Sequence, residues 1–243
     1  MKIIIAGYGF VGRAHHELLK DKHEIIIHDP ALGYDANGKI ADAVIICVST
    51  PARHDGACEM ANVYQAIEAA PNVPILIKST ISPEGWDMLM DVFPERTIAF
   101  SPEFLRAASA VEDLQNMNRL LIGGDGVNTW AKIFNVDVEV ADPKELILAK
   151  YFRNSFLATK VAFFNQMYDL CKALGVEYKA VAHYTGMDER IGHSHTSVTE
   201  QRGFGGHCFP KDTAAIVKTG QRDNVDLSLI KEAIRYNKSI RSE

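Results

Sequence analysis

The sequence predicts an α/β fold in which a Rossmann-type, doubly wound parallel sheet is followed by a helical domain built on one long central helix. Three observations support this prediction. A glycine-rich turn follows the first apolar run, short apolar runs then alternate with helical segments, and a long stretch without glycine or proline begins after Pro143. We expect two domains, residues 1–141 with the sheet and residues 142–243 with the helices.

The first predicted strand, Lys2 to Ala6, leads into Gly7-Tyr8-Gly9-Phe10-Val11-Gly12 and then into a helix from Arg13 to Lys20. In a GxGxxG turn the first glycine allows the bend, the second lets a pyrophosphate approach the backbone, and the third lets helix and strand pack closely. The helix N-terminus adds N–H donors for the phosphates. We therefore predict a dinucleotide site that includes Gly7, Gly9, Phe10, Val11 and Gly12.

A carboxylate ends the second predicted strand, which runs from Glu24 to His28. Asp29 stands where an acidic residue hydrogen-bonds the ribose hydroxyls of the adenosine half and repels a 2′-phosphate. The sequence therefore predicts NAD rather than NADP as the cofactor.

Four further apolar runs are predicted strands: Ala43–Val48, Pro74–Lys78, Thr97–Phe100 and Arg119–Ile122, with helical segments at Met60–Ala70 and Glu84–Val92 between them. Ligands bind at the carboxyl ends of the strands in doubly wound sheets. Thr50, Thr80 and Glu103 are therefore candidate site residues by position. The alternative is plain turn chemistry, because Ser, Thr and Pro favour loops in any case.

The helical domain begins with Asp142 and Pro143, a pair typical of a helix N-cap and first turn. No glycine or proline occurs from Lys144 to Leu174, and Gly175 follows as a stop signal. This pattern predicts a helix of about 32 residues, roughly 48 Å long. A domain of this size cannot cover such a helix, so we expect a homodimer through it. The candidate packing or dimer contacts are Phe152, Phe156, Phe163 and Phe164.

A single cysteine lies in the segment Gly203-Phe204-Gly205-Gly206-His207-Cys208-Phe209-Pro210-Lys211-Asp212. The glycines permit tight turns and close approach of a ligand. A thiol reacts as its thiolate, which nearby cations and dipoles favour, so the segment suits a nucleophilic cysteine. The alternative is a glycine-rich loop with a buried, inert cysteine.

Lys150 and Asn154 are spaced to share one face of the long helix, although spacing alone equally fits a solvated lysine beside a neutral asparagine. Other distinctive strings are Ser79-Thr80-Ile81-Ser82-Pro83-Glu84-Gly85, Ser101-Pro102-Glu103-Phe104-Leu105-Arg106 and Asp188-Glu189-Arg190-Ile191-Gly192. Together with the two glycine-rich segments, and in this order, they make the chain resemble the UDP-glucose/GDP-mannose 6-dehydrogenase family from Met1 to about Asn237.

The resemblance implies an NAD-dependent oxidation of a sugar-nucleotide C6 alcohol, UDP-glucose foremost, to a carboxylate in two hydride transfers. It implies that Cys208 forms a thiohemiacetal and then a thioester. Asp212, Lys150 and Glu103 would serve proton removal. Lys150 and Asn154 would stabilise the oxyanion, and Thr80 and Glu103 would hold the hydrolytic water.

The resemblance also implies binding roles. The cofactor would contact Thr50, Thr80 and Lys211 besides the glycine-rich turn and Asp29. The sugar nucleotide would contact Glu103, Phe104, Leu105, Lys150, Asn154, Arg190 and Gly205, with Arg190 reaching the sugar site of the partner subunit.

Several features depart from the family pattern. The usual C-terminal nucleotide-sugar-binding domain has no counterpart after the last predicted helix, Asp226–Ile240. The stretch Pro30–Asp42 is short, Ala107 replaces an acidic residue, and residues 192–202 lack the pattern that holds the nucleotide phosphates. Three interpretations stay open: a minimal active 6-dehydrogenase, a dehydrogenase of a different or smaller sugar substrate, and a non-catalytic NAD-binding module that pairs with a full-length partner.

Composition limits the remaining function classes. The net charge of −5 argues against nucleic acid or an anionic membrane as the main partner. The four cysteines have no disulfide or zinc spacing, which suits a reducing compartment, and we expect a cytoplasmic protein. His193, His195 and His207 could join Cys208 around zinc. A metal on Cys208 would block its thiol chemistry, so we predict no metal site.

Overall fold

The computed structural model describes residues 1–105 and 109–242 of the 243-residue chain. They form two compact units, the first from Met1–Arg53 and Cys58–Lys150, the second from His54–Ala57 and Tyr151–Glu243. The division falls inside the long helix. The domain boundary that we expect at 141/142 stays a prediction.

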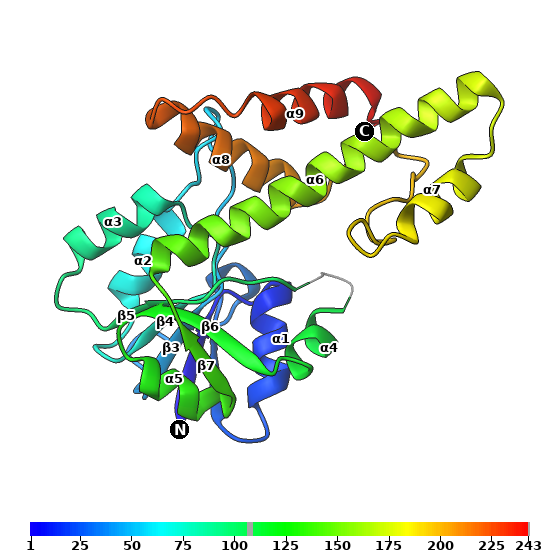
Figure 1. The fold of residues 1–243 in the computed structure, drawn as a ribbon. Helices are drawn as coiled ribbons and strands as arrows, with labels where there is room; N and C mark the ends of the chain where they lie inside the picture. The colour runs from blue at the N-terminus through cyan, green and yellow to red at the C-terminus, as the bar shows by residue number, and fades with distance from the viewer. Residues whose placement is uncertain (106–108, 243) are drawn as a thin grey trace. The chain divides into compact units, whose positions relative to one another are not determined.

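The first unit contains a seven-stranded sheet in the order β2-β1-β3-β4-β5-β6-β7 (Figure 1). Its strands are β1 (Lys2–Ala6), β2 (Glu24–His28), β3 (Ala43–Ile46), β4 (Ile75–Ile77), β5 (Ile98–Phe100), β6 (Arg119–Gly124) and β7 (Asp137–Val140). The neighbours from β2 to β5 pair in parallel, β6 is antiparallel to β5, and β7 is parallel to β6. The Rossmann-type α/β fold is confirmed, but the sheet is mixed rather than wholly parallel.

Helices cover both faces of this sheet. They are α1 (Phe10–Leu19), α2 (Ala61–Ala69), α3 (Pro83–Val92), α4 (Ala110–Gln115) and α5 (Val127–Phe134), with a short 3-10 helix at Pro30–Leu32. One core cluster joins the alternate strand residues Ile3 and Ile5 to Leu19 of α1 and Trp130 of α5. Figure 1 shows α2 and α3 on the opposite side of the sheet from α1 and α4. The unit is therefore doubly wound.

The long helix α6 runs from Pro143 to Leu174, as predicted. The Asp142 Oδ1 atom accepts a hydrogen bond from the Lys144 N–H at 2.7 Å and caps the first turn. Gly175 ends the helix with φ +68°, a left-handed conformation that glycine adopts without a steric penalty.

In the second unit three more helices accompany α6: α7 (Tyr178–Gly186), α8 (Phe209–Arg222) and α9 (Ser228–Ile240). Two apolar clusters pack other segments of this unit against α6. One contains Ala158, Ala162, Phe204 and Ala233, and the other contains Phe164, Cys171, Tyr178 and Ala182. Phe164 is therefore a packing residue, whereas Phe152, Phe156 and Phe163 are exposed. None of the helices in the described residues is sufficiently long and apolar for a bilayer-spanning segment.

Candidate functional site

In the glycine-rich turn between β1 and α1, one of the three glycines has free space where a side chain would lie. Gly7 has φ +91°, and a Cβ there would lie 2.7 Å from the carbonyl carbon of Cys47. A Cβ on Gly12 would lie 2.1 Å from the carbonyl oxygen of Gly7, but a Cβ on Gly9 would meet no atom within 4 Å. Gly7 and Gly12 are thus required for packing, whereas Gly9 leaves the N-terminus of α1 open to a dinucleotide pyrophosphate.

Asp29, the predicted ribose-binding acid, lies beside the same turn. Its Oδ2 atom accepts a hydrogen bond from the Tyr8 N–H at 2.7 Å, and the residue is only half-buried. Phe10 is exposed and Val11 is half-buried in the first turn of α1. These positions fit the adenosine half of a bound NAD.

Three predicted site residues follow neighbouring parallel strands. Thr50, Thr80 and Glu103 come after β3, β4 and β5, which pair side by side. The Thr50 hydroxyl donates a hydrogen bond to the Thr80 carbonyl oxygen at 2.7 Å. The structure thus brings these residues to one edge of the sheet, as their positions in the sequence predict.

Glu103 belongs to a buried ion pair that the sequence did not reveal. Its Oε2 atom lies 3.3 Å from the Lys78 ammonium, and the two side chains are 7% and 2% exposed. Its Oε1 atom accepts hydrogen bonds from the Phe104 and Leu105 N–H groups at 2.8 and 3.1 Å. The Lys150 ammonium donates to the Glu103 carbonyl oxygen at 2.7 Å. Glu103 therefore connects the strand end to the start of α6.

Burial is the largest influence on the Glu103 carboxyl and by itself raises its pKa. The charges of Lys78, His15 and Lys150, with the Lys78 hydrogen bond, outweigh burial, so the pKa lies below its usual value. Glu103 is therefore a carboxylate at neutral pH, which a base or a water-holding residue requires.

His15 is a second residue that sequence reasoning missed. It is fully buried in α1, and its Nδ1 lies 2.9 Å from the Val11 carbonyl oxygen, which can only accept. Nε2 has no hydrogen-bond partner in the described part of the chain. Burial, and then the charge of Lys78, lower the pKa of His15 to about 4. The ring is thus neutral at pH 7.

Lys78 is a third residue that sequence reasoning missed. The sequence feature that could have identified it is a lysine directly after three apolar strand residues.

In the second unit Asp212 is buried in the first turn of α8. Its Oδ2 atom accepts a hydrogen bond from the Asn154 Nδ2 at 2.5 Å, and its Oδ1 atom accepts one from the Lys211 ammonium at 2.5 Å. The structure therefore brings three predicted site residues together. The Asp212 carboxylate also fixes the orientation of the Asn154 amide.

Cys208 directly precedes α8, at the positive end of the helix dipole. It is exposed, whereas Cys58 and Cys171 are buried and Cys47 is half-buried, and none of these four cysteines forms a disulfide. Burial raises the pKa of the Cys47 thiol. The alternative of a buried Cys208 is therefore wrong, and this thiol is the one most open to a ligand.

The remaining predicted site residues differ in their surroundings. The Arg190 side chain is 88% exposed and pairs with Asp188 at 2.5 Å. Phe104 and Leu105 are half-buried beside Glu103, and Gly205 is half-buried in the segment before Cys208. The Arg106 and Ala107 positions of the family pattern lie outside the described residues.

Two of the three histidines of residues 192–207 make ring contacts. His193 stacks on His183 with centroids 5.5 Å apart, and the His195 ring lies 5.7 Å from that of Phe209. Residues 1–105 and 109–242 hold no group of three or more His, Cys, Asp or Glu side chains arranged for a metal ion. The zinc alternative therefore finds no ligand set there.

Known proteins resemble both parts of the chain. Residues 31–136 match the NAD binding domain of the UDP-glucose/GDP-mannose dehydrogenase family, and residues 145–239 match its central domain. The chain belongs to this family. The predicted family and the predicted NAD cofactor are thereby confirmed, and the open Gly9 position fits that cofactor.

Among curated members of the UDP-glucose/GDP-mannose dehydrogenase family, the UDP-glucose 6-dehydrogenase of Rickettsia conorii is 36% identical over 82% of this chain and 49% of its own length. That of Rhizobium meliloti is 32% identical over 98% of this chain and 67% of its own length. The chain spans about half the length of the Rickettsia relatives that it matches.

Solved structures share the fold of this chain. A UDP-glucose dehydrogenase from Pyrobaculum islandicum superimposes with a TM-score of 0.85 at 26% identity, covering 98% of this chain and 68% of that one. A 3-hydroxyisobutyrate dehydrogenase from Mycobacterium tuberculosis shares the fold, with a TM-score of 0.73 at 17% identity over 98% of this chain and 93% of that one.

Proposed function

We propose that this chain catalyses the NAD-dependent oxidation of the C6 alcohol of a sugar nucleotide, UDP-glucose foremost, to a carboxylate. The observation that carries the proposal is an exposed thiol, Cys208, at the start of the helix whose first turn holds the buried Asp212. A nucleophile is required for the second oxidation, because an aldehyde must first become tetrahedral before it can release a hydride. The names of the curated relatives favour UDP-glucose as substrate.

The chemistry balances as two oxidations and a hydrolysis. When held at Gly9 and Asp29, NAD would supply the hydride acceptor for each oxidation. The first oxidation takes a proton from the hydroxyl and a hydride from C6, leaving an aldehyde. The Cys208 sulfur then adds to the aldehyde carbon and forms a thiohemiacetal, whose loss of a hydride and a proton gives a thioester. Water cleaves the thioester, releases the carboxylate and regenerates the thiol, so each sugar yields two NADH.

We assign proton removal to Asp212, Glu103 and Lys150. The hydrogen bonds that Asp212 accepts from Asn154 and Lys211 support its assignment, because they hold the carboxylate in one orientation. The lowered pKa of Glu103 keeps its carboxylate deprotonated at neutral pH, as a proton acceptor must be, although it also makes the group a weaker base.

The remaining roles follow the chemistry of each side chain. Lys150 and Asn154 are one turn apart on α6 and would stabilise the developing oxyanion. Thr80, with Glu103, would hold the hydrolytic water. Thr50 and Lys211 would contact the cofactor.

NADH formation by this chain, measured with UDP-glucose, GDP-mannose and UDP-N-acetyl sugars, tests the proposal. We expect two NADH and one carboxylate per sugar. Cys208→Ser should lose the carboxylate product, whereas Cys171→Ala, which alters a buried thiol on α6, should keep both oxidations. NAD binding without turnover on any sugar nucleotide would contradict the proposal and favour a non-catalytic NAD-binding module.

We also propose a homodimer formed through α6. Five exposed apolar side chains recur on this helix at intervals of one or two turns and so share one face: Phe152, Phe156, Phe163, Leu170 and Leu174. A continuous apolar stripe of this kind is typical of an interaction surface. Phe156→Glu should therefore yield a monomer in light-scattering chromatography. Leu229→Glu, at an exposed apolar position on α9, should leave the mass of the dimer unchanged.

A further inference from the structure

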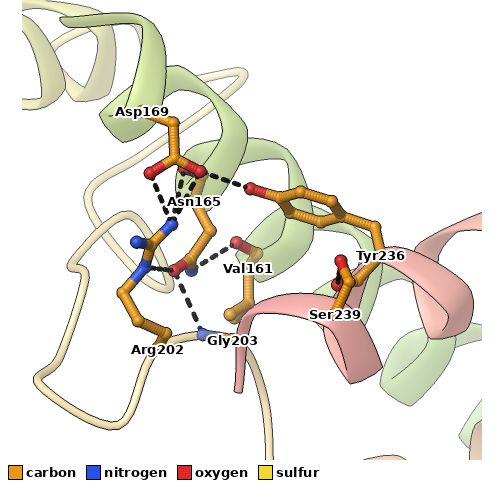
Figure 2. A network of polar contacts seen from close by, with 7 residues as sticks. All are labelled: Val161, Asn165, Asp169, Arg202, Gly203, Tyr236 and Ser239. Carbon is orange, nitrogen blue, oxygen red and sulfur yellow. Dashed lines mark hydrogen bonds and ion pairs between the residues drawn. The ribbon is translucent and has the colours of Figure 1, made fainter. Parts of the chain in front are cut away.

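A polar network fastens the start of the Cys208 loop (Gly203–Asp212) to α6 (Figure 2). Arg202, the residue just before the loop, donates from Nε to the Asn165 Oδ1 at 2.8 Å. Its Nη2 lies 2.8 and 2.9 Å from the two carboxylate oxygens of Asp169. The guanidinium carbon also lies 4.8 Å from the ring centre of Tyr168. Two successive turns of α6 therefore hold one guanidinium.

Asn165 joins the backbone of the loop to the same network. Its side chain is fully buried, and its Oδ1 atom accepts a second hydrogen bond, from the Gly203 N–H at 3.0 Å. Its Nδ2 donates to the Val161 carbonyl oxygen at 2.9 Å. The amide can satisfy these partners in only one orientation, with its oxygen toward the loop.

Arg202 has a backbone conformation that non-glycine residues rarely adopt. Its φ is +58°, in the left-handed region, and Gly203 follows with φ +54°. Two successive left-handed residues turn the chain sharply into the loop. Strain of this kind persists only where the surrounding contacts determine the conformation, and the guanidinium contacts on α6 are of that kind.

Contacts from α9 complete the network. The Asn237 amide accepts a hydrogen bond from the Phe204 N–H at 2.6 Å and donates one to the Phe204 carbonyl oxygen at 2.9 Å. The Tyr236 hydroxyl donates to the Asp169 Oδ2 at 2.9 Å. The first residues of the loop are thus held between α6 and α9.

The same helix also holds the far end of the loop, through the hydrogen bond from Asn154 to Asp212. Asn165 follows Asn154 by about three turns, or roughly 16 Å along one face of α6. Cys208 lies in the sequence between these two anchors. Because both anchors lie on one helix, α6 fixes the distance between the two ends of the loop.

We propose that Arg202 is a positioning residue, which sets the course of the Cys208 loop from its start and thereby the place of the Cys208 sulfur. This inference rests on the proposed role of Cys208 as the nucleophile. Arg202 acts through Asn165 and Asp169 and touches no reacting atom. Its loss removes the guanidinium contacts that hold the left-handed turn at the start of the loop. The backbone hydrogen bonds of Gly203 and Phe204 and the Asp212 anchor remain, so the loop stays attached but its course, and the sulfur, are less confined.

The alkylation rate of Cys208 by iodoacetamide tests this inference without any substrate, with the modified peptide identified by mass spectrometry. Arg202→Met removes both the charge and the forked donor set. We expect it to raise the rate by about fivefold or more, because the exposed thiol of a more mobile loop meets the reagent in more orientations. Arg202→Lys keeps the charge but not the fork, so its rate should be intermediate. Arg119→Met breaks an exposed pair with Glu139 in the first unit and should leave the rate unchanged.

Steady-state kinetics give a second measurement. Arg202→Met should lower kcat by about tenfold, because misplacement of a reacting group slows the chemical step. The KM for NAD should not change, because the glycine-rich turn belongs to the first unit and Lys211 is still held by the Asp212 anchor. A purely stabilising role would lower the melting temperature without changing kcat or the alkylation rate of the folded protein.

The outcomes separate the two proposals. A folded Arg202→Met protein whose alkylation rate and kcat match those of the wild type overturns the role of Arg202. A wild-type protein without turnover counts against the proposed function, yet the alkylation comparison still decides the role of Arg202. If Arg202→Met does not fold, Asp169→Asn, which keeps the side-chain volume but removes the ion pair, replaces it in the same comparison.

Discussion

Replacing Lys78 by methionine should destabilise the first unit by about 3 kcal/mol at pH 7, because it leaves a buried charge without its partner. The Lys78 and Glu103 side chains are almost fully buried and lie 3.3 Å apart. Breaking such a pair costs about 3–5 kcal/mol. The lower end applies because two backbone N–H groups still bond the Glu103 carboxylate, at 2.8 and 3.1 Å. Methionine has a similar volume, so little of the loss arises from a cavity.

Urea unfolding followed by circular dichroism measures this loss. Lys144→Met is the matched control. It breaks the Lys144–Asp87 pair, which is 2.7 Å long but about half exposed, and should cost less than about 1 kcal/mol. Adding Glu103→Gln to Lys78→Met should recover part of the loss, because the unpaired charge is then gone. A Lys78→Met loss no larger than that of the control would refute the buried-pair argument.

The pH dependence of the Lys78→Met penalty checks the sign of the effect. In the wild type the folded pKa of Glu103 is below its usual 4.5, so its stabilisation is present above that pH and is lost as the pH falls through the folded pKa. Without Lys78, burial raises the pKa of Glu103 with less opposition, and protonation relieves the penalty. The penalty should therefore shrink between pH 8 and pH 5. A constant penalty would indicate lost packing instead of lost charge.

Two further predictions concern the same unit. The pKa of His15 falls from 6.5 to about 4 on folding, so the wild type should lose about 3 kcal/mol of stability as the pH drops through this range. His15→Asn should remove that slope in thermal unfolding across pH, while His54→Asn, at an exposed position, should keep it. Gly9→Ala should weaken NAD binding about tenfold or more in calorimetry with no change in melting temperature. The added Cβ would meet no protein atom within 4 Å and would occupy only the space open to the pyrophosphate. Gly12→Ala should lower the melting temperature as well, because its Cβ would lie 2.1 Å from a backbone oxygen; equal melting temperatures for these two variants would contradict this account of the turn.

The elements that the sequence predicts well are those with local causes. The six predicted strands coincide with β1 to β6, and α6 lies between a capping aspartate and a stopping glycine. The direction of β6 has no such cause, because an apolar run reads the same for a parallel and an antiparallel strand. β7 lies at the sheet edge and is mostly exposed, so its sequence Asp-Val-Glu-Val contains no apolar run to find.

The candidate site shows the same limit. Thr50, Thr80 and Glu103 can be located from strand ends, and Cys208 from its glycine-rich surroundings, since both are properties of the sequence. The partners that set the charge of Glu103 are tertiary contacts. A lysine after an apolar run shows that a buried charge needs a partner. It does not show which carboxylate will be that partner. Nothing in the α1 sequence indicates that His15 is buried near Lys78 and Glu103.

Arg202 lies at the end of residues 192–202, the stretch that departs from the family's phosphate-holding pattern. Its ion pair with Asp169 is 22% and 47% exposed, so it stabilises the fold by no more than about 1 kcal/mol. The left-handed backbone of Arg202 costs about 1–3 kcal/mol. The hydrogen bond to Asn165 and the contact with the Tyr168 ring add about 1 kcal/mol each. Because the contacts and the strain then nearly cancel, Arg202→Gly, which removes both together, should leave the melting temperature almost unchanged. The same variant should still raise the alkylation rate of Cys208. A large drop in melting temperature with an unchanged alkylation rate would show instead that the network stabilises the fold and does not direct the loop.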